Sequence, residues 1–204
     1  MQPRIRLLYP SSLTDYEVKS ASRALERFAK FGLEVDQVQV GKGSLRDVLW
    51  VRSGREIRDV INAKEKVIVD DWALRPGVLQ VLLTMRIIGV GITPAQLFRM
   101  ENGVKEPRIG LSRHQQGALV SISSFMDFEY STSQKAIELA VAHELGHIFI
   151  DRSERHCPDK NCLMQENKDC MDFLDRFVKP ELDFCRKCLY DIKNGIRMFT
   201  FSLL

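Results

Sequence analysis

The spacing of histidines and cysteines in the last third of this chain constrains its fold more than any other sequence feature. All five cysteines of the 204 residues follow residue 156, and three of the four histidines lie between residues 143 and 156. The N-terminal segment lacks the apolar run of a signal peptide. In a chain without an export signal, such a local cluster favours metal binding over disulfides. We therefore expect the C-terminal part to fold around bound metal.

The first metal-binding motif is His143-Glu144-Leu-Gly-His147, within a segment that is apolar from Ile137 to Ile150. The segment predicts a helix, on which residues four apart lie one turn above each other, so both imidazoles can bind one ion. Glu144 lies about 100° further round the helix, where its carboxylate can take a proton from a water held by zinc. A surface helix without metal is the alternative, but burying this face without a partner would be costly.

Four cysteines predict a second and separate metal site. Cys157 and Cys162 have a Cx4C spacing, and Cys185 and Cys188 have a Cx2C spacing after a further 22 residues. Four thiolates around one zinc leave no open position, so this site would stabilise the fold. His156 precedes the first of these cysteines and is the candidate third ligand of the histidine site, which would keep a position for water. Cys170 is left over as a free thiol.

These motifs resemble the signature of the archaemetzincin family of zinc metallopeptidases, which has HExxH, a later HC-x4-C-x-M and a final CxxC. The resemblance implies that His143, His147 and His156 bind a catalytic zinc and that Glu144 is the general base. It further implies that Met164 forms a Met-turn, an apolar floor under the histidines. A second, structural zinc would be held by the four cysteines already named: Cys157, Cys162, Cys185 and Cys188. The activity implied is hydrolysis of peptide bonds.

The sequence departs from the family pattern between His147 and His156. Eight residues, "IFIDRSER", separate these histidines where the family has five, and the glycine that lets the chain leave the helix is missing. Three additional residues amount to nearly one helical turn, a rise of about 5 Å. Asp151 and Glu154 are therefore alternative third ligands, because zinc also accepts carboxylate oxygens.

The order of the expected elements favours a single α/β domain, with a mixed, twisted sheet flanked by helices. The resemblance implies that this domain, residues 1–204, is zincin-like. Residues 1–130 would form a sheet-and-helix part, and residues 131–204 the active-site helix and a C-terminal segment tied by the four-cysteine site. The expected strands cover residues 5–9, 33–40, 86–93 and 119–123, and the expected helices cover residues 15–31, 55–69, 76–85 and 131–150. Residues 117–123 form either an exposed edge that could bind a peptide or an internal strand.

The charge balance bears on the expected partners. With 30 basic and 27 acidic residues the formal net charge is only +3, which argues against nucleic acid. No apolar run is long enough to span a membrane. We expect a cytoplasmic monomer that acts on peptide or protein substrates. Two other functions stay open: a catalytically inactive zinc-binding scaffold, and a nucleic-acid-binding finger that uses Arg186 and Lys187.

Overall fold

A five-stranded mixed sheet forms the centre of the molecule in this computed structural model. The structure describes residues 4–40, 49–51, 62, 67–68, 72–74, 87–115, 117–150, 156–167, 170–177 and 182–201. The strand order is β2 (Glu34–Val40), β1 (Arg4–Pro10), β6 (Ile87–Thr93), β10 (Gly117–Ser121) and β9 (Gly110–Arg113). Neighbouring strands are parallel except β9, which pairs antiparallel with β10. The α/β fold class predicted from the sequence is therefore confirmed.

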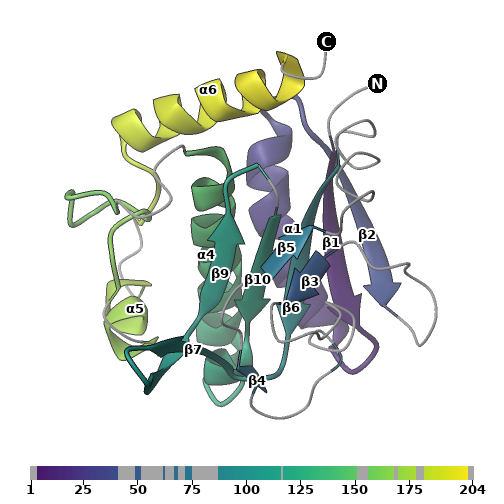
Figure 1. The fold of residues 1–204 in the computed structure, drawn as a ribbon, viewed down its shortest axis with the longest axis vertical. Helices are drawn as coiled ribbons and strands as arrows, with labels where there is room; N and C mark the ends of the chain where they lie inside the picture. Colours follow the sequence, from purple (N-terminus) through teal and green to yellow (C-terminus); the bar gives the residue numbers. More distant parts are fainter. Residues whose placement is uncertain are drawn as a thin grey trace.

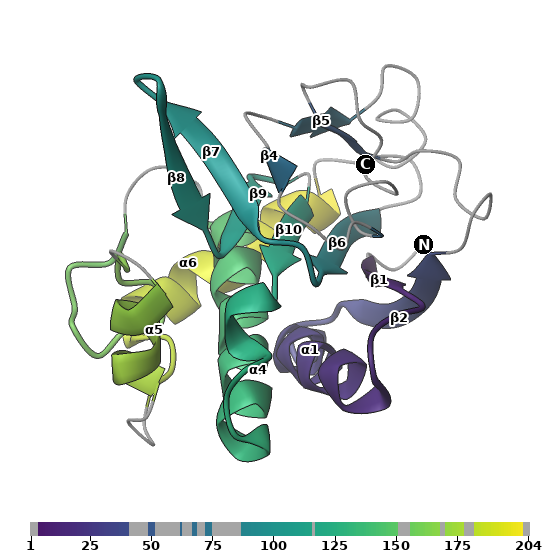
Figure 2. The same ribbon diagram turned by 90° about the horizontal axis from the view of Figure 1, so that it is seen from below.

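Two helices cover one face of this sheet. α1 (Asp15–Ala29) contacts β1 and β2, while α4 (Tyr130–Phe149) contacts β9, β10 and α1 (Figures 1 and 2). β6 and β10 are buried along their whole length, as expected for strands at the centre of a covered sheet. The hydrophobic core lies between these strands and the two helices.

Local sequence signals explain where α1 begins and ends. The carboxylate of Glu17 accepts hydrogen bonds from the backbone N–H and the hydroxyl of Thr14, at 2.6 and 2.7 Å, which satisfies groups at the helix start. After the helix, Gly32 adopts a φ of +93°, a conformation that glycine adopts without strain. The helix ends two residues earlier than the predicted residue 31, and the strand that follows begins one residue later than predicted.

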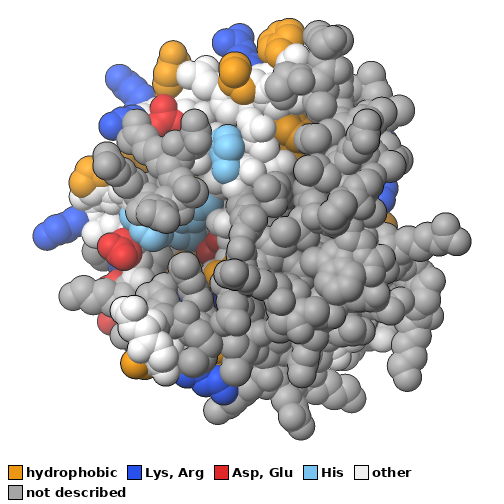
Figure 3. Space-filling model, in the orientation of Figure 1, with side chains coloured by type: hydrophobic (Ala, Val, Ile, Leu, Met, Phe, Trp, Pro, Cys, Tyr) orange, Lys and Arg blue, Asp and Glu red, His pale blue; other side chains and the backbone are white. Residues whose placement is uncertain are grey.

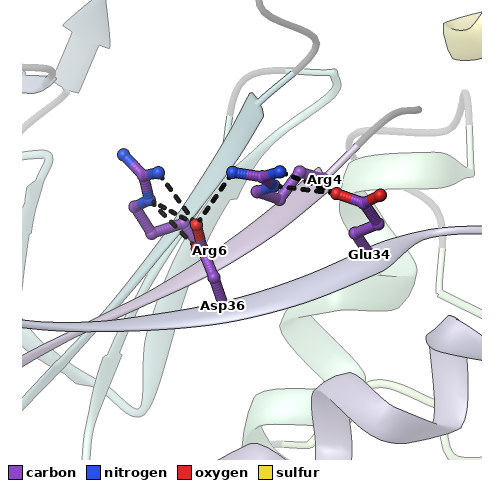
Figure 4. A network of polar contacts seen from close by, with 4 residues as sticks. All are labelled: Arg4, Arg6, Glu34 and Asp36. Carbon is purple, nitrogen blue, oxygen red and sulfur yellow. Dashed lines mark hydrogen bonds and ion pairs between the residues drawn. The ribbon is translucent and has the colours of Figure 1, made fainter. Parts of the chain in front are cut away.

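Opposite charges align across the parallel pair of strands at the far edge of the sheet. Arg4 lies opposite Glu34 and Arg6 opposite Asp36 in the β1–β2 register, and their side chains form ion pairs at 2.7 and 2.8 Å (Figure 4). Such cross-strand pairs support the register of a sheet. They alternate along β1 with Ile5 and Leu7, which are fully buried in the core.

A β-hairpin that the periodicity did not indicate precedes the edge strand. It consists of β7 (Leu97–Glu101) and β8 (Val104–Arg108), and β7 also pairs with β4 (Val67–Ile68). Its two-residue turn is Asn102-Gly103, with φ of +50° and +78°. An Asn-Gly pair is a strong hairpin signal in a sequence, so this element was predictable.

A further strand pair, β3 (Leu49–Val51) with β5 (Trp72–Leu74), lies on the side of the main sheet opposite α1 and α4 (Figure 2).

The C-terminal part wraps around α4. α5 (Cys170–Phe177) and α6 (Arg186–Phe201) both contact it, and α6 crosses its C-terminal end (Figure 1). At the crossing, Gly195 lies so close to the backbone carbonyl of Phe149 that a Cβ atom would overlap it. A short 3-10 helix, η1 (Ser123–Phe125), leads from β10 towards α4. Among the described residues, none of the helices is long and apolar enough to cross a lipid bilayer.

Some sequence predictions fall on other parts of the chain. The helix expected over residues 76–85 lies outside the described residues, as does nearly all of the one expected over 55–69. Where that second range is described near its end, residues 67–68 form the strand β4.

Candidate metal centres

The C-terminal half of α4, from Leu139 to Phe149, is buried throughout, and this places the HExxH motif in the interior of the molecule. His143, Glu144 and His147 are 6%, 8% and 9% exposed, and the surrounding helix positions are apolar. The buried half of this helix is covered by its neighbours, which are the sheet, α1, α5 and α6. The helix begins at Tyr130, slightly before the predicted residue 131.

The structure brings the three predicted histidines together. Nitrogen atoms of His143, His147 and His156 all lie within 4.8 Å of one another. The Nε2 atoms of His143 and His147 are 3.1 Å apart, and the ring of His156 lies 4.9 Å from that of His147. Zinc with bonds of about 2.0–2.1 Å to nitrogen holds neighbouring nitrogens about 3.3 Å apart, so the donor set fits this metal. The alternative ligands Asp151 and Glu154 lie outside the described residues.

Backbone contacts fix the tautomer of His143. Its Nδ1 atom is 2.7 Å from the carbonyl oxygen of Leu163, so Nδ1 carries the proton and Nε2 presents a lone pair to the histidine group. Burial is the main cause that lowers the pKa of His143 to about 4 and that of His147 to about 2. Burial also lowers the pKa of His156. Neutral imidazoles are the form that binds metal.

Glu144 lies next to the histidines and beneath the edge strand β9. Burial raises the pKa of its carboxyl group to about 7, although a hydrogen bond from Ser112 and the positive charge of Arg108 oppose this shift. Gly110 lies directly against the Glu144 side chain. The carboxyl group of Glu144 therefore belongs to the same turn of α4 as His143 and has a pKa suited to taking and releasing a proton near neutral pH.

Met164 packs against the histidine helix from the opposite loop. It is 2% exposed, and its sulfur atom contacts Gly146, between the two helical histidines. A side chain at Gly146 would collide with Met164 and meet Phe184, so the glycine of the motif allows the loop to approach.

Histidine side chains reach the molecular surface, as the pale-blue atoms of Figure 3 show.

The four predicted cysteines form a second cluster beside the first. The sulfur atoms of Cys157, Cys162, Cys185 and Cys188 lie within 4.8 Å of one another, and all four thiols are free. Those of Cys157 and Cys185 are 3.7 Å apart, which matches the spacing of about 3.8 Å expected for thiolates bonded to zinc at about 2.3 Å. His156 and Cys157 are adjacent in sequence but belong to different clusters.

The surroundings of the cysteines also suit a metal. The backbone N–H groups of Met164 and Cys185 point to the sulfur of Cys162, at 3.4 and 3.3 Å. Burial raises the pKa of Cys162 to about 11 and also raises that of Cys188. At Cys185, hydrogen bonds outweigh burial and lower the pKa. A cation would favour the thiolate form in all of these residues.

The structure also places residues 117–123 and Tyr130 relative to the histidines. β10 is an internal strand, and β9 is the edge strand on that side of the sheet, so the exposed-edge interpretation of residues 117–123 is wrong. Tyr130 begins α4, thirteen residues before His143, and is therefore about 20 Å from it along the helix. Its ring contacts that of Tyr16, so this side chain packs against α1. The side chain of Cys170 lies outside the described residues.

Comparison with known proteins gives one consistent result. No protein-family model matches the sequence, and no curated protein matches it significantly. Two solved structures are similar over nearly the whole chain, both archaemetzincins at 17% sequence identity. The one from Methanopyrus kandleri has a TM-score of 0.59 over 96% of each chain. The one from Archaeoglobus fulgidus, in complex with malonate, has a TM-score of 0.56 over 93% of this chain and 99% of its own. The chain therefore has the archaemetzincin fold.

Proposed function

We propose that this protein is a zinc-dependent peptidase with its reaction centre at His143, His147 and His156. The convergence of these three nitrogen donors next to Glu144 is the observation that carries the proposal. Zinc at this centre would supply Lewis acidity, which makes water nucleophilic near neutral pH and polarises a carbonyl group. The four cysteines would hold a second zinc that stabilises the fold.

Glu144 would act as general base and then as general acid. Its carboxylate takes a proton from the water that attacks the scissile carbonyl carbon. As the C–N bond breaks, the same carboxyl group returns the proton to the departing amine. The group must be ionised for the first step and protonated for the second, and its burial, which raises its pKa, favours its return to the protonated form.

A peptide or protein is the substrate that the sheet favours. β9 lies at the end of the strand order and passes over Glu144. An extended peptide could pair with this strand, and main-chain hydrogen bonds would then place a peptide bond beside the histidines. We further propose a cytoplasmic location, since free thiols that bind metal suit a reducing compartment.

The position of His156 supports a peptidase over a catalytically inactive scaffold. The longer segment after His147 gave reason to expect a lost third ligand, but the ring of His156 stacks on that of His143 at 5.6 Å. The metal content distinguishes the two functions: about two zinc ions per chain are expected for the enzyme. A single ion retained by the cysteines would support the scaffold.

Glu144→Gln tests the chemistry directly. This variant should keep its zinc but lose hydrolysis of any cleaved peptide by about 10²–10⁴-fold, the usual contribution of general acid–base catalysis. The matched control is Glu138→Gln on the same helix, where the carboxylate pairs with Arg27 instead. The assigned role of Glu144 is wrong if Glu144→Gln cleaves as fast as the wild type.

A further inference from the structure

One buried arginine holds both ends of a loop that the two metal centres share. Arg176, on α5, is 9% exposed. Its Nη2 atom donates to the carbonyl oxygen of Cys162 at 2.7 Å. Its Nη1 atom donates to the side chain of Asn167 at 2.5 Å and reaches the carbonyl oxygen of Gln165 at 3.4 Å. We call residues 162–167 the strap.

The strap contributes to each metal centre. Cys162 belongs to the cysteine cluster. The next residue, Leu163, accepts the hydrogen bond that orients His143, and Met164 packs under the histidine helix. The carbonyl group of Met164 also accepts a hydrogen bond from the backbone of Cys157 at 2.7 Å. A displacement of the strap would therefore move groups at both centres.

The cost of burying Arg176 indicates that this arrangement has a role. Burying the charged guanidinium group is costly, and the negative charge of Asp172 offsets part of that cost. The three oxygens that it contacts in the strap are neutral, and its Nε atom finds no acceptor among the described residues. A planar fork with several donors can bridge separate oxygens in a way that a lysine cannot.

The charge of Arg176 has opposite consequences at the two centres. Four thiolates around one divalent zinc carry a net charge of −2, which a neighbouring cation stabilises. At the histidine centre the same positive charge repels a metal ion, because Arg176 binds the strap next to Leu163, which contacts His143. Charge alone would therefore weaken metal binding by the histidines.

We propose that Arg176 is a positioning residue for both metal centres. By fixing the strap, it sets the orientation of His143 through Leu163 and the position of Cys162. This positioning outweighs the repulsion at the histidines. The inference rests on the proposed metal-binding function and adds a residue that is not itself a ligand.

Cobalt titration of the zinc-containing protein tests the inference at the histidine centre. Protein loaded with one zinc ion per chain at the cysteines is titrated with Co²⁺, and the visible absorption of nitrogen-bound cobalt reports binding by the histidines. Arg176→Met should weaken this binding by about 10–100-fold, the range seen when groups that orient metal ligands are removed. A purely electrostatic role predicts the reverse, tighter binding, because a repelling charge is lost.

Two more variants distinguish the geometry of the guanidinium fork from its charge. They also keep the inference testable if Arg176→Met does not fold. Arg176→Lys keeps the charge but not the fork, so it should also bind cobalt more weakly at the histidines while retaining zinc at the cysteines. Asn167→Ala removes one contact of the guanidinium and should weaken cobalt binding a few-fold. The matched control is Arg4→Met, which removes an arginine from an ion pair at the far edge of the sheet.

The outcomes distinguish this inference from the proposed function. Wild-type protein that takes up no cobalt at the histidines would overturn the metal centre and the inference together. Wild-type uptake with equal affinity in all three variants, or tighter binding in Arg176→Met, would overturn the role of Arg176 alone.

Discussion

A Cβ atom placed on Gly110 would lie 2.5 Å from Cγ of Glu144 and 2.6 Å from its carboxyl carbon. Carbon atoms that are not bonded do not approach so closely, so only glycine fits at this position of β9 unless one of the two moves. The edge strand and the candidate general base therefore determine each other's position. This relationship between β9 and α4 was not visible in the sequence, because the residues are 34 positions apart.

Gly110→Ala should impair hydrolysis without removing metal. The new methyl group displaces either the Glu144 carboxylate or the edge strand. A displacement of about 1 Å at a reacting group can cost on the order of 10²-fold in rate. We expect kcat to fall by about 10–100-fold with zinc content unchanged, measured by steady-state kinetics and metal analysis. Val104→Ala, at an exposed position of the adjacent hairpin, is the control. Wild-type kcat in Gly110→Ala would show that the contact is not restrictive.

Ser112→Ala should shift the pH dependence of the reaction. The hydrogen bond from Ser112 favours the ionised form of Glu144 and so lowers its pKa, against the larger opposing effect of burial. Without it the pKa rises, and a smaller fraction of the base is ionised at any given pH. The acidic limb of the kcat/KM profile should therefore move to higher pH. If the kcat/KM profiles of Ser112→Ala and the wild type coincide, the hydrogen bond from Ser112 does not influence catalysis. Ser123→Ala, whose hydroxyl contacts Ser121 instead, is the control.

The parts of the fold that follow from local sequence were predictable. Thr14 and Gly32 mark the ends of α1, and the apolar run of β6 indicates a central strand. The apolar spacing of Cys188, Ile192, Ile196 and Phe199 would equally have indicated α6, since these residues are all buried on one face. α6 was not predicted, because its first turn carries Cys188, whose Cx2C spacing from Cys185 indicates a metal site rather than a helix.

The parts that depend on tertiary contacts were not predictable. The spacing of the HExxH motif predicted that His143 and His147 share a face, because helix geometry is local. Whether His156 reaches the other two histidines depends on the path of the chain after α4. The eight residues between His147 and His156 allow several such paths. The roles of Leu163, Ser112 and Arg176 arise from contacts between segments that no local pattern relates.

Cys188→Ser should release metal from the cysteine centre and destabilise the fold. Cys188 is 7% exposed and begins the buried face of α6, so its loss leaves three thiolates and a weaker attachment of that helix. Structural zinc contributes directly to folding free energy, and we expect a loss of at least about 3 kcal/mol. Chemical denaturation and metal analysis would measure both effects. Cys170→Ser should retain the wild-type metal content, because Cys170 is the predicted free thiol. Equal behaviour of the two variants would contradict the assignment of ligands.

Gly195→Ala should destabilise the protein, although alanine is the better helix former. In an isolated helix the change would favour folding by about 1 kcal/mol. Here the added methyl group overlaps the carbonyl group of Phe149, where α6 crosses the end of α4. A backbone cannot rotate away as a side chain can, so the helices must separate and lose buried contacts around Ile192 and Ile196. Overpacking of this kind typically costs about 1–3 kcal/mol net.

Urea denaturation should show a lower midpoint for Gly195→Ala. In the control Arg197→Ala, on the exposed side of the same helix, the free energy of unfolding should stay within about 0.5 kcal/mol of the wild-type value. A Gly195→Ala midpoint at or above the wild-type value would mean that the two helices do not cross at this residue.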